Sequence, residues 1–266
     1  MIKAHGGSLV NLYADGDQLL AEKEKAQSNV SWDLTDRQMF DIELLLNGAF
    51  SPLTGYLSQT DYDAVVSSMR LANGTLWPIP INLDVSEAFA AELSQGDEVT
   101  LRDPEGVVIA NLTVSDIWTP DRKYEAEQVF GTTDTAHPGV SKLLNDTNPV
   151  YLGGKLVGVT QPLHYDFGQY RRDPHQLRAH FQEQGLSNVI AFQTRNPVHK
   201  AHVIMMKRLM AKHQAHLVIH TAVGLTKPGD IDHYCRVRCY EKIVDKFPAG
   251  SAEISLLPLA MRMAGP

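Results

Sequence analysis

The segment FQTRNPVHKAHV, residues 192–203, gathers side chains that suit the binding and activation of an anion. It contains the guanidinium of Arg195, the amide of Gln193 and the imidazoles of His199 and His202. The two histidines are three residues apart, so they share one face of a helix's first turn. A planar guanidinium, an amide and two imidazoles at one place favour a phosphate or another tetrahedral oxyanion as the ligand.

Simpler explanations exist for each residue alone. His199 and His202 also fit a metal pair without a third ligand, or two surface residues, and Arg195 fits a solvated charge after a strand. The combination favours a site, because a strand-type run, NVIAF, comes before the segment and a helical pattern follows the turn at Asn196–Pro197. The amino end of that helix offers free N–H groups and a partial positive charge to an anion.

The last hundred residues alternate between strand-type and helix-type patterns. Strands are predicted over parts of 188–192, 216–223 and 252–257, with helices over 199–213 and 229–247 between them. This order predicts a parallel sheet with crossover helices. Ligands of such sheets bind beyond the carboxyl ends of the strands, which is where the QTRNP turn leaves the first strand.

The earlier part of the chain is predicted to be rich in short strands. The β-rich runs 99–101, 107–114 and 150–159 are separated by Gly, Pro and Asp. A helix is predicted to begin after an N-cap at Thr35 and to end at Gly48. The chain is therefore expected to contain two different domains.

The predicted domains, residues 1–167 and 168–266, differ in charge. The first has ten Lys and Arg against 24 Asp and Glu, a net charge of −14, and the second has 14 against seven, a net charge of +7. Eight of the eleven histidines also lie in the second domain. The basic second domain indicates an anionic ligand. No nucleic-acid-binding signature is present, so a small anion is favoured over nucleic acid.

Composition places the protein in an ordinary class. Hydrophobic residues make up 43% and charged residues 21% of the chain, as in soluble globular proteins. The sequence has neither a secretory signal pattern nor an apolar run of the roughly 18 residues that a membrane helix needs. Only two cysteines occur, Cys235 and Cys239, which rules out a disulfide framework and favours a cytoplasmic location.

The segment QTRNPVHKAH resembles the Q-x-R-N-P-x-H-x-x-H motif of the ATP sulfurylases. The resemblance implies that Gln193 and Arg195 bind sulfate and that His199 and His202 stabilise charge on the α-phosphate of ATP. The implied catalytic residues are Thr194, Arg195, Asn196, His199 and His202. The implied ATP-binding residues are Gln193, Thr194, Arg195, Asn196 and Arg262.

Other segments carry the same resemblance. Residues 223–241 resemble the family's V-G-x-T-K-x-G-D segment, in which we expect a turn at Lys227–Pro228–Gly229 and Asp230 as a helix N-cap. Residues 256–266 resemble its P-x-x-M-R-x-A-G-P segment, whose arginine corresponds to Arg262. The earlier segments NGAFSPLTGYL, VFGTTDTAHPGV, VYLGGKLVGV and HYDF are also similar, so the resemblance covers essentially the whole chain, and it is nearest to the fungal and kinase-fused bacterial branch.

The resemblance implies a fold and a reaction. The expected fold is α/β, with a β-rich PUA-like domain before a truncated Rossmann-like nucleotidylyltransferase domain. The expected reaction joins ATP and sulfate to give adenylyl sulfate (APS) and pyrophosphate, with Mg²⁺ entering on ATP and not held by a protein motif. A cytoplasmic homo-oligomer with no nucleic-acid or membrane partner is expected.

The family's G-R-D-H-A-G-P-G loop does not occur before Pro266. The sequence is therefore expected to be a fragment of a longer protein, with little activity by itself. The alternative is a protein of a different functional class, a sulfate- or nucleotide-binding module that does not catalyse a reaction. A third interpretation, an RNA-binding first domain, is disfavoured by the charge of −14, because phosphate backbones need a positive surface.

Overall fold

The computed structural model describes residues 3–225, 229–262 and 264. These residues form two compact units, each described here by itself. The amino-terminal unit contains residues 5–162 together with Arg262 and Ala264. The carboxyl-terminal unit contains residues 163–261 together with Lys3 and Ala4. The predicted domain boundary between residues 167 and 168 stays a prediction.

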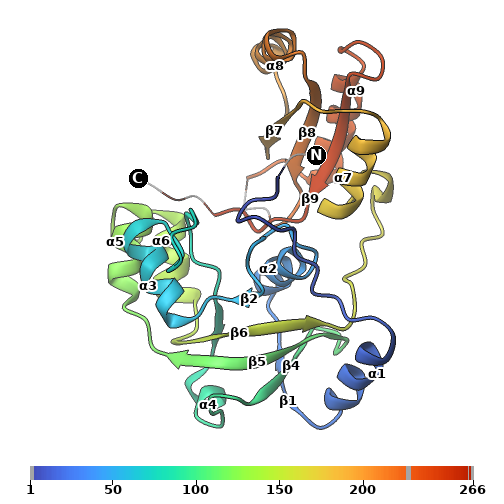
Figure 1. Ribbon diagram of the computed structural model, residues 1–266. Coiled ribbons are helices and arrows are strands. Elements are labelled where there is room, and N and C mark those ends of the chain that lie inside the picture. Colours follow the sequence, from blue (N-terminus) through green and yellow to red (C-terminus); the bar gives the residue numbers. More distant parts are fainter. Residues whose placement is uncertain (1–2, 226–228, 263, 265–266) are drawn as a thin grey trace. The chain divides into compact units, whose positions relative to one another are not determined.

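The amino-terminal unit is built on one mixed sheet (Figure 1). Its strands are β1 (Val30–Asp33), β2 (Gly55–Tyr56), β3 (Leu83–Val85), β4 (Glu98–Arg102), β5 (Val108–Trp118) and β6 (Val150–Gly158). The strand order is β1-β4-β5-β6-β2, with β3 also paired to β6. All these pairs are antiparallel except β1 with β4. The strands predicted over 99–101, 107–114 and 150–159 are thus confirmed as β4, β5 and β6.

Several short helices surround this sheet. They are α1 (Gly16–Lys25), α2 (Asp36–Leu46), α3 (Gln59–Ser68), α4 (Glu87–Ala90), α5 (Arg122–Phe130), α6 (Pro138–Ser141) and the π-helix η1 (Lys142–Asp146). Thr35 is the N-cap of α2, as predicted, and forms a capping box with Gln38. The buried side chains of Ile42 and Leu45 on α2 belong to the same core as Leu112 of β5. Burial of each such side chain contributes roughly 1.5–3 kcal/mol.

Two buried acidic side chains of the amino-terminal unit, Glu125 and Asp41, have partners. Glu125 of α5, which is 7% exposed, accepts hydrogen bonds from the hydroxyls of Tyr62 at 2.9 Å and Tyr151 at 3.2 Å. Asp41 of α2, whose side chain is 1% exposed, forms an ion pair with Arg262. A buried charge without a partner would cost several kcal/mol, so these contacts stabilise the packing of α5 against α3 and β6, and that of α2 against Arg262.

The carboxyl-terminal unit contains a three-stranded parallel sheet. Its strands are β7 (Val189–Thr194), β8 (His216–Ala222) and β9 (Ala252–Leu257), in the order β7-β8-β9. Its helices are α7 (Pro174–Glu183), α8 (Lys200–His213) and α9 (His233–Val244), with the short 3₁₀ helix η2 (Gly168–Tyr170). The predicted alternation of strands and helices and the parallel pairing are confirmed.

The core of this unit lies between the sheet and two helices. Leu217 and Ile219 of β8 and Ile254 of β9 are buried in one cluster with Met206 of α8 and Val237 of α9. Helix α8 contacts β7 and β8. Helix α9 contacts β9 and lies beside that strand in Figure 1. Both crossover helices therefore bury their apolar side against the sheet, and each connection returns the chain to the carboxyl-terminal unit's next parallel strand.

The exits of β8 and β9 approach each other closely at Gly224. A Cβ atom on Gly224 would lie 2.1 Å from the carbonyl oxygen of Leu259, so the backbone spacing there requires glycine. The carboxyl ends of the three parallel strands, at Thr194, Ala222 and Leu257, therefore lie at one edge of the sheet. This edge is where side chains after each strand can meet.

Candidate active site

The predicted anion-binding segment begins inside β7 and ends in a bend. β7 continues through Thr194, two residues further than predicted, because Gln193 and Thr194 still pair with β8. The Thr194 carbonyl accepts a hydrogen bond from the hydroxyl of Thr221 at 2.9 Å. Oγ1 of Thr194 in turn accepts from the backbone N–H of Asn196 at 3.1 Å. These contacts fix the bend at Arg195 and Asn196 relative to the carboxyl end of the sheet.

The two histidines lie at the start of α8, and their rings stack. The imidazole centroids of His199 and His202 are 3.8 Å apart, and the ring planes differ by 29°. His199 is the N-cap residue of α8 and so precedes the helix, although the sequence predicted it inside the first turn. His202 lies in that turn, and its ring is 5.4 Å from the ring of Phe192. The pair is thereby held against the end of β7.

One atom of this pair is buried and unpaired. Within the described part of the chain, Nδ1 of His202 has no hydrogen-bond partner. Buried nitrogen atoms of side chains normally have one, and exceptions often occur at functional positions. The atom is therefore consistent with a site in which a ligand or water completes the hydrogen bonding.

Arg195 forms an ion pair at the same edge of the sheet. Its Nη1 lies 3.2 Å from Oδ2 of Asp230, in the loop that follows β8. The prediction that Asp230 caps the next helix is wrong, because α9 begins only at His233 and its N-cap is Asp232. Asp232 accepts a hydrogen bond from the N–H of Tyr234 at 2.8 Å, while the carboxylate of Asp230 accepts one from Arg195. The predicted turn at Lys227–Pro228 lies outside the described residues.

Two residues of α9 that the sequence motifs do not indicate hold the bend. Arg236 donates from Nη1 to the carbonyl of Arg195 at 2.8 Å, and Tyr240 donates from its hydroxyl to the carbonyl of Asn196 at 2.8 Å. The sequence did contain a signal for Arg236, because a charged residue on the apolar face of a predicted helix needs partners inside the fold. Arg236 and Tyr240 are four residues apart and share the face that continues to Ile243.

Arg262, the remaining predicted site residue, does not belong to the carboxyl-terminal unit, which contains Arg195, His199 and His202. It belongs to the amino-terminal unit, where Nη1 donates to Oδ1 of Asp41 at 2.9 Å and Nη2 donates to Oδ2. Burial alone would lower the pKa of the Arg262 guanidinium, but the charge and hydrogen bonds of Asp41 raise it above its ordinary value. Its predicted contact with the phosphates of ATP stays a prediction.

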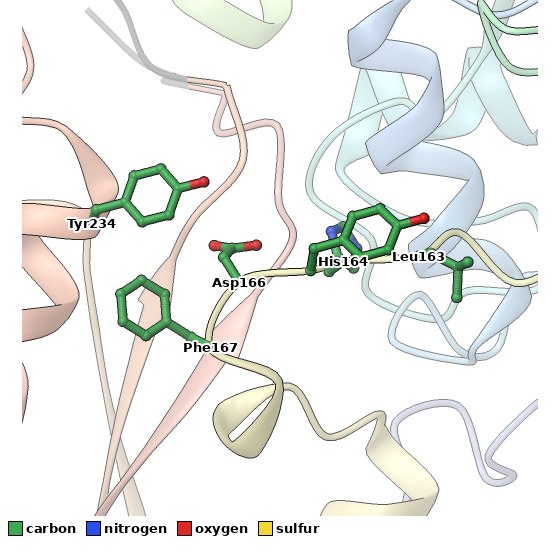
Figure 2. A pocket seen from close by; sticks show the side chains of 6 residues that line it. Leu163, His164, Asp166, Phe167 and Tyr234 are labelled. Atoms are coloured by element: carbon green, nitrogen blue, oxygen red, sulfur yellow. The ribbon is translucent and has the colours of Figure 1, made fainter.

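A shallow pocket of about 510 Å³ lies elsewhere in the carboxyl-terminal unit (Figure 2). Its lining residues are Leu163, His164, Tyr165, Asp166, Phe167 and Tyr234. Asp166 accepts hydrogen bonds from His233 at 2.9 Å and from Nη2 of Arg171 at 2.9 Å. Burial alone would raise the pKa of the Asp166 carboxyl, but those hydrogen bonds lower it below its usual range. None of the predicted catalytic residues lines this pocket.

Among the residues that the structure describes, no group of three or more His, Cys, Asp or Glu side chains is arranged to hold a metal ion. None of the helices described has both the length and the apolar character needed to cross a membrane. Arg195, the two imidazoles and the backbone N–H groups at the start of α8 lie at or directly after the carboxyl end of β7.

Family models match both parts of the chain, and sulfate adenylyltransferases are similar to it in sequence. A PUA-like domain model matches residues 2–161, and an ATP-sulfurylase model matches residues 168–266. Sulfate adenylyltransferase of Schizosaccharomyces pombe is 54% identical over 235 residues, which are 88% of this chain and 48% of that protein. Sulfate adenylyltransferase of Saccharomyces cerevisiae is 48% identical, over 98% of this chain and 52% of that protein.

A solved structure has the same fold. The hexameric APS kinase from Thiobacillus denitrificans matches with a TM-score of 0.80 and 32% identity, over 97% of this chain and 47% of that chain. The chain thus spans about half the length of the relatives that it matches. The two domain matches and the sequence identity to sulfate adenylyltransferases lead to one assignment. This chain belongs to the ATP sulfurylase family, with a PUA-like domain followed by an ATP-sulfurylase domain.

Proposed function

We propose that the chain, in its full-length context, is a sulfate adenylyltransferase that converts ATP and sulfate to APS and pyrophosphate, or runs the reverse reaction. The observation that carries this proposal is the joint placement of Arg195 and the stacked pair His199 and His202 at the carboxyl end of β7. The names of the relatives, sulfate adenylyltransferase, support the same reaction.

In this proposal the bend after β7 binds sulfate. Arg195 can present a planar pair of N–H donors to two sulfate oxygens, and Gln193 can donate through its amide. Asp230 pairs with Arg195 in the structure, so sulfate has to compete with a carboxylate or bind beside it. Thr194 and Asn196 shape the bend and belong to the ATP-facing part of the site, and Arg262 remains a candidate phosphate contact.

The chemistry requires two anions to come into contact. A sulfate oxygen attacks the α-phosphorus of ATP, the new S–O–P linkage forms, and the bond to the pyrophosphate oxygen breaks in line. Charge builds on the α-phosphate oxygens during this step, and His199 and His202 can donate hydrogen bonds to them. No covalent enzyme intermediate is needed, so positioning and charge stabilisation supply most of the rate enhancement.

Mg²⁺ fits this reaction as part of the substrate. The family's chemistry depends on ATP, whose β- and γ-phosphates bind Mg²⁺ and leave as pyrophosphate with part of its negative charge offset by the ion. Arg195, Gln193 and the two histidines at the end of β7 are cationic, amide or imidazole groups, which suit phosphate oxygens, and the Asp230 carboxylate beside them is paired with Arg195. MgATP is therefore the proposed nucleotide substrate, with the ion held by its phosphates.

We also propose a cytoplasmic homo-oligomer. The similar protein from Thiobacillus denitrificans is hexameric by its name, which supports an assembly of several copies. Light scattering of the purified protein measures its mass in solution directly. A mass of one chain at assay concentrations would contradict this part of the proposal.

The function is tested by pyrophosphate release from ATP. The assay is run with and without sulfate, on this chain and on the full product of its gene. Sulfate-dependent release and formation of APS by the full product would support the adenylyltransferase. Sulfate binding without any release by the full product would favour the binding module instead.

A further inference from the structure

We infer that Arg236 and Tyr240 of α9 are positioning residues for the oxyanion-binding bend, and that Arg236 also adds a fixed positive charge beside it. This inference rests on the proposed function, because it concerns how the same bend is held in its binding geometry. Neither residue is among those that the family motif identifies.

The first observation is the burial of a full positive charge. Arg236 is 2% exposed, although arginine is almost never fully buried without partners. Its hydrogen bonds go to backbone carbonyl oxygens: Nη1 to Arg195 at 2.8 Å and to Ala222 at 2.9 Å, and Nε to Ile231 at 3.0 Å. Because these partners are neutral carbonyls, they satisfy the N–H groups of Nε and Nη1 and leave the positive charge of Arg236 in place.

The three carbonyls belong to the three segments that surround the site. Arg195 lies in the bend after β7, Ala222 ends β8, and Ile231 lies in the loop that carries Asp230. One planar guanidinium therefore fixes the spacing of all three segments. A side chain that only filled space in the core would not need this set of partners.

Tyr240 makes a second contact on the same helix face. It is 0% exposed, and its hydroxyl donates to the carbonyl of Asn196 at 2.8 Å. Arg236 and Tyr240 thus hold two successive carbonyl groups, those of Arg195 and Asn196. With both carbonyls directed toward α9, the orientation of the peptide groups that carry the Arg195 side chain is fixed.

The charge of Arg236 has its own consequence for an anion. A cation in a poorly solvated region is screened much less by water and salt than a surface cation. Arg236 is one hydrogen bond from the backbone of Arg195, the residue proposed to hold sulfate. We therefore expect Arg236 to favour the bound dianion and to have its main effect on sulfate affinity.

The test compares variants in the full gene product by steady-state kinetics, with thermal stability measured for each. Tyr240→Phe removes one hydroxyl and is expected to raise the KM for sulfate about three- to tenfold, with a smaller rise in the KM for MgATP because Asn196 belongs to the ATP-facing part of the site. Arg236→Met is expected to raise the sulfate KM further, and Arg236→Lys to recover part of that loss because the charge is retained.

Matched controls separate positioning from general destabilisation. Tyr170→Phe also removes a hydroxyl that donates a hydrogen bond to α9, to Oε1 of Glu241 at 2.9 Å, but this hydroxyl is not bonded to the bend. Arg238→Met removes a cation from the exposed face of the same helix. Both controls should keep the sulfate KM of the unmodified enzyme.

Two results would overturn the inference. One is a sulfate KM within about twofold of the unmodified enzyme for both Tyr240→Phe and Arg236→Met, in an assay in which Arg195→Ala no longer saturates with sulfate. The inference would then be wrong and the proposed function would remain supported. The other is an equal loss for sulfate and MgATP that follows a drop in thermal stability, which indicates a purely structural role. If Arg195→Ala itself keeps normal sulfate kinetics, the proposed function fails together with the inference.

Discussion

Arg262 and Asp41, which are 221 residues apart in the chain, form a two-point ion pair in the amino-terminal unit. The Asp41 side chain is 1% exposed, and Nε of Arg37 lies farther away, 3.9 Å from Oδ2 of the same carboxylate. A residue that follows β9 in the sequence therefore supplies the main cationic partner of a buried carboxylate in the amino-terminal unit. This relationship gives Arg262 a structural role whether or not it also contacts ATP.

Removal of Arg262 is expected to destabilise the amino-terminal unit. Arg262→Met leaves the buried Asp41 carboxylate without its main partner, and loss of one member of a buried pair costs about 3–5 kcal/mol. Urea denaturation of the chain, followed by tryptophan fluorescence, measures this change. The double variant Asp41→Asn with Arg262→Met should recover part of the loss, while the exposed control Lys23→Met should change stability by less than about 0.5 kcal/mol. An Arg262→Met protein as stable as that control would contradict the structural role.

Arg195→Ala is expected to remove most sulfate-dependent activity of the full gene product. It deletes the guanidinium that can contact two sulfate oxygens, and hydrogen bonds to charged groups contribute about 1.5–3 kcal/mol each. The expected result is a fall of about a hundredfold or more in kcat/KM for sulfate. Arg208→Ala, at an exposed position of α8, is the control and should behave normally. Unchanged sulfate kinetics in Arg195→Ala would show that sulfate binds elsewhere.

His202→Asn is expected to lower the maximal rate with only a modest change in substrate binding. The imidazole is proposed to donate to the α-phosphate as charge builds in the transition state, so its loss should appear mainly in kcat, by about 10²-fold. Initial rates over a matrix of ATP and sulfate concentrations separate the two effects. His213→Asn, at the exposed end of α8, provides the comparison. Weaker ATP binding with an unchanged kcat would mean that His202 acts on the ground state instead.

Glu125 is expected to make the amino-terminal unit more stable as the pH falls toward 4.5. Burial raises the pKa of the Glu125 carboxyl above its ordinary value of 4.5, against the lowering effect of hydrogen bonds from Tyr62 and Tyr151. Between 4.5 and the raised folded-state pKa, the folded protein keeps a proton that the unfolded chain releases. The free energy of unfolding therefore decreases as pH rises through this window and is constant above the folded-state pKa.

Glu125→Gln should remove this pH dependence while keeping an oxygen that can accept from the tyrosine hydroxyls. Urea denaturation of both proteins between about pH 4.5 and neutral pH gives the difference, in which the titration of other groups cancels. Glu127→Gln, exposed on the same helix, should leave the slope intact. Parallel stability curves for Glu125→Gln and the unmodified chain would be inconsistent with a raised pKa.

The sequence by itself determined the order of the three parallel strands and the two helices between them, and the position of the site motif in the chain. Apolar periodicity predicted β7, β8, β9 and the helices between them, and a polar segment after the first strand predicted where an anion would bind. These features are local, because backbone geometry and side-chain type within about ten to fifteen residues decide them. The ends of elements depend on contacts from elsewhere: pairing with β8 extends β7 through Thr194, and Asp232 caps α9 in place of Asp230.

Only the tertiary structure decided which distant groups meet. Arg195 pairs with Asp230, Arg236 donates to the carbonyl of Arg195, and Arg262 pairs with Asp41, across separations of 35, 41 and 221 residues. No periodicity encodes such pairs, since each depends on where the sheets and helices bring the chain back. The physical reason is that a charge can remain in a buried place only where folding supplies partners for it, and those partners come from the whole fold.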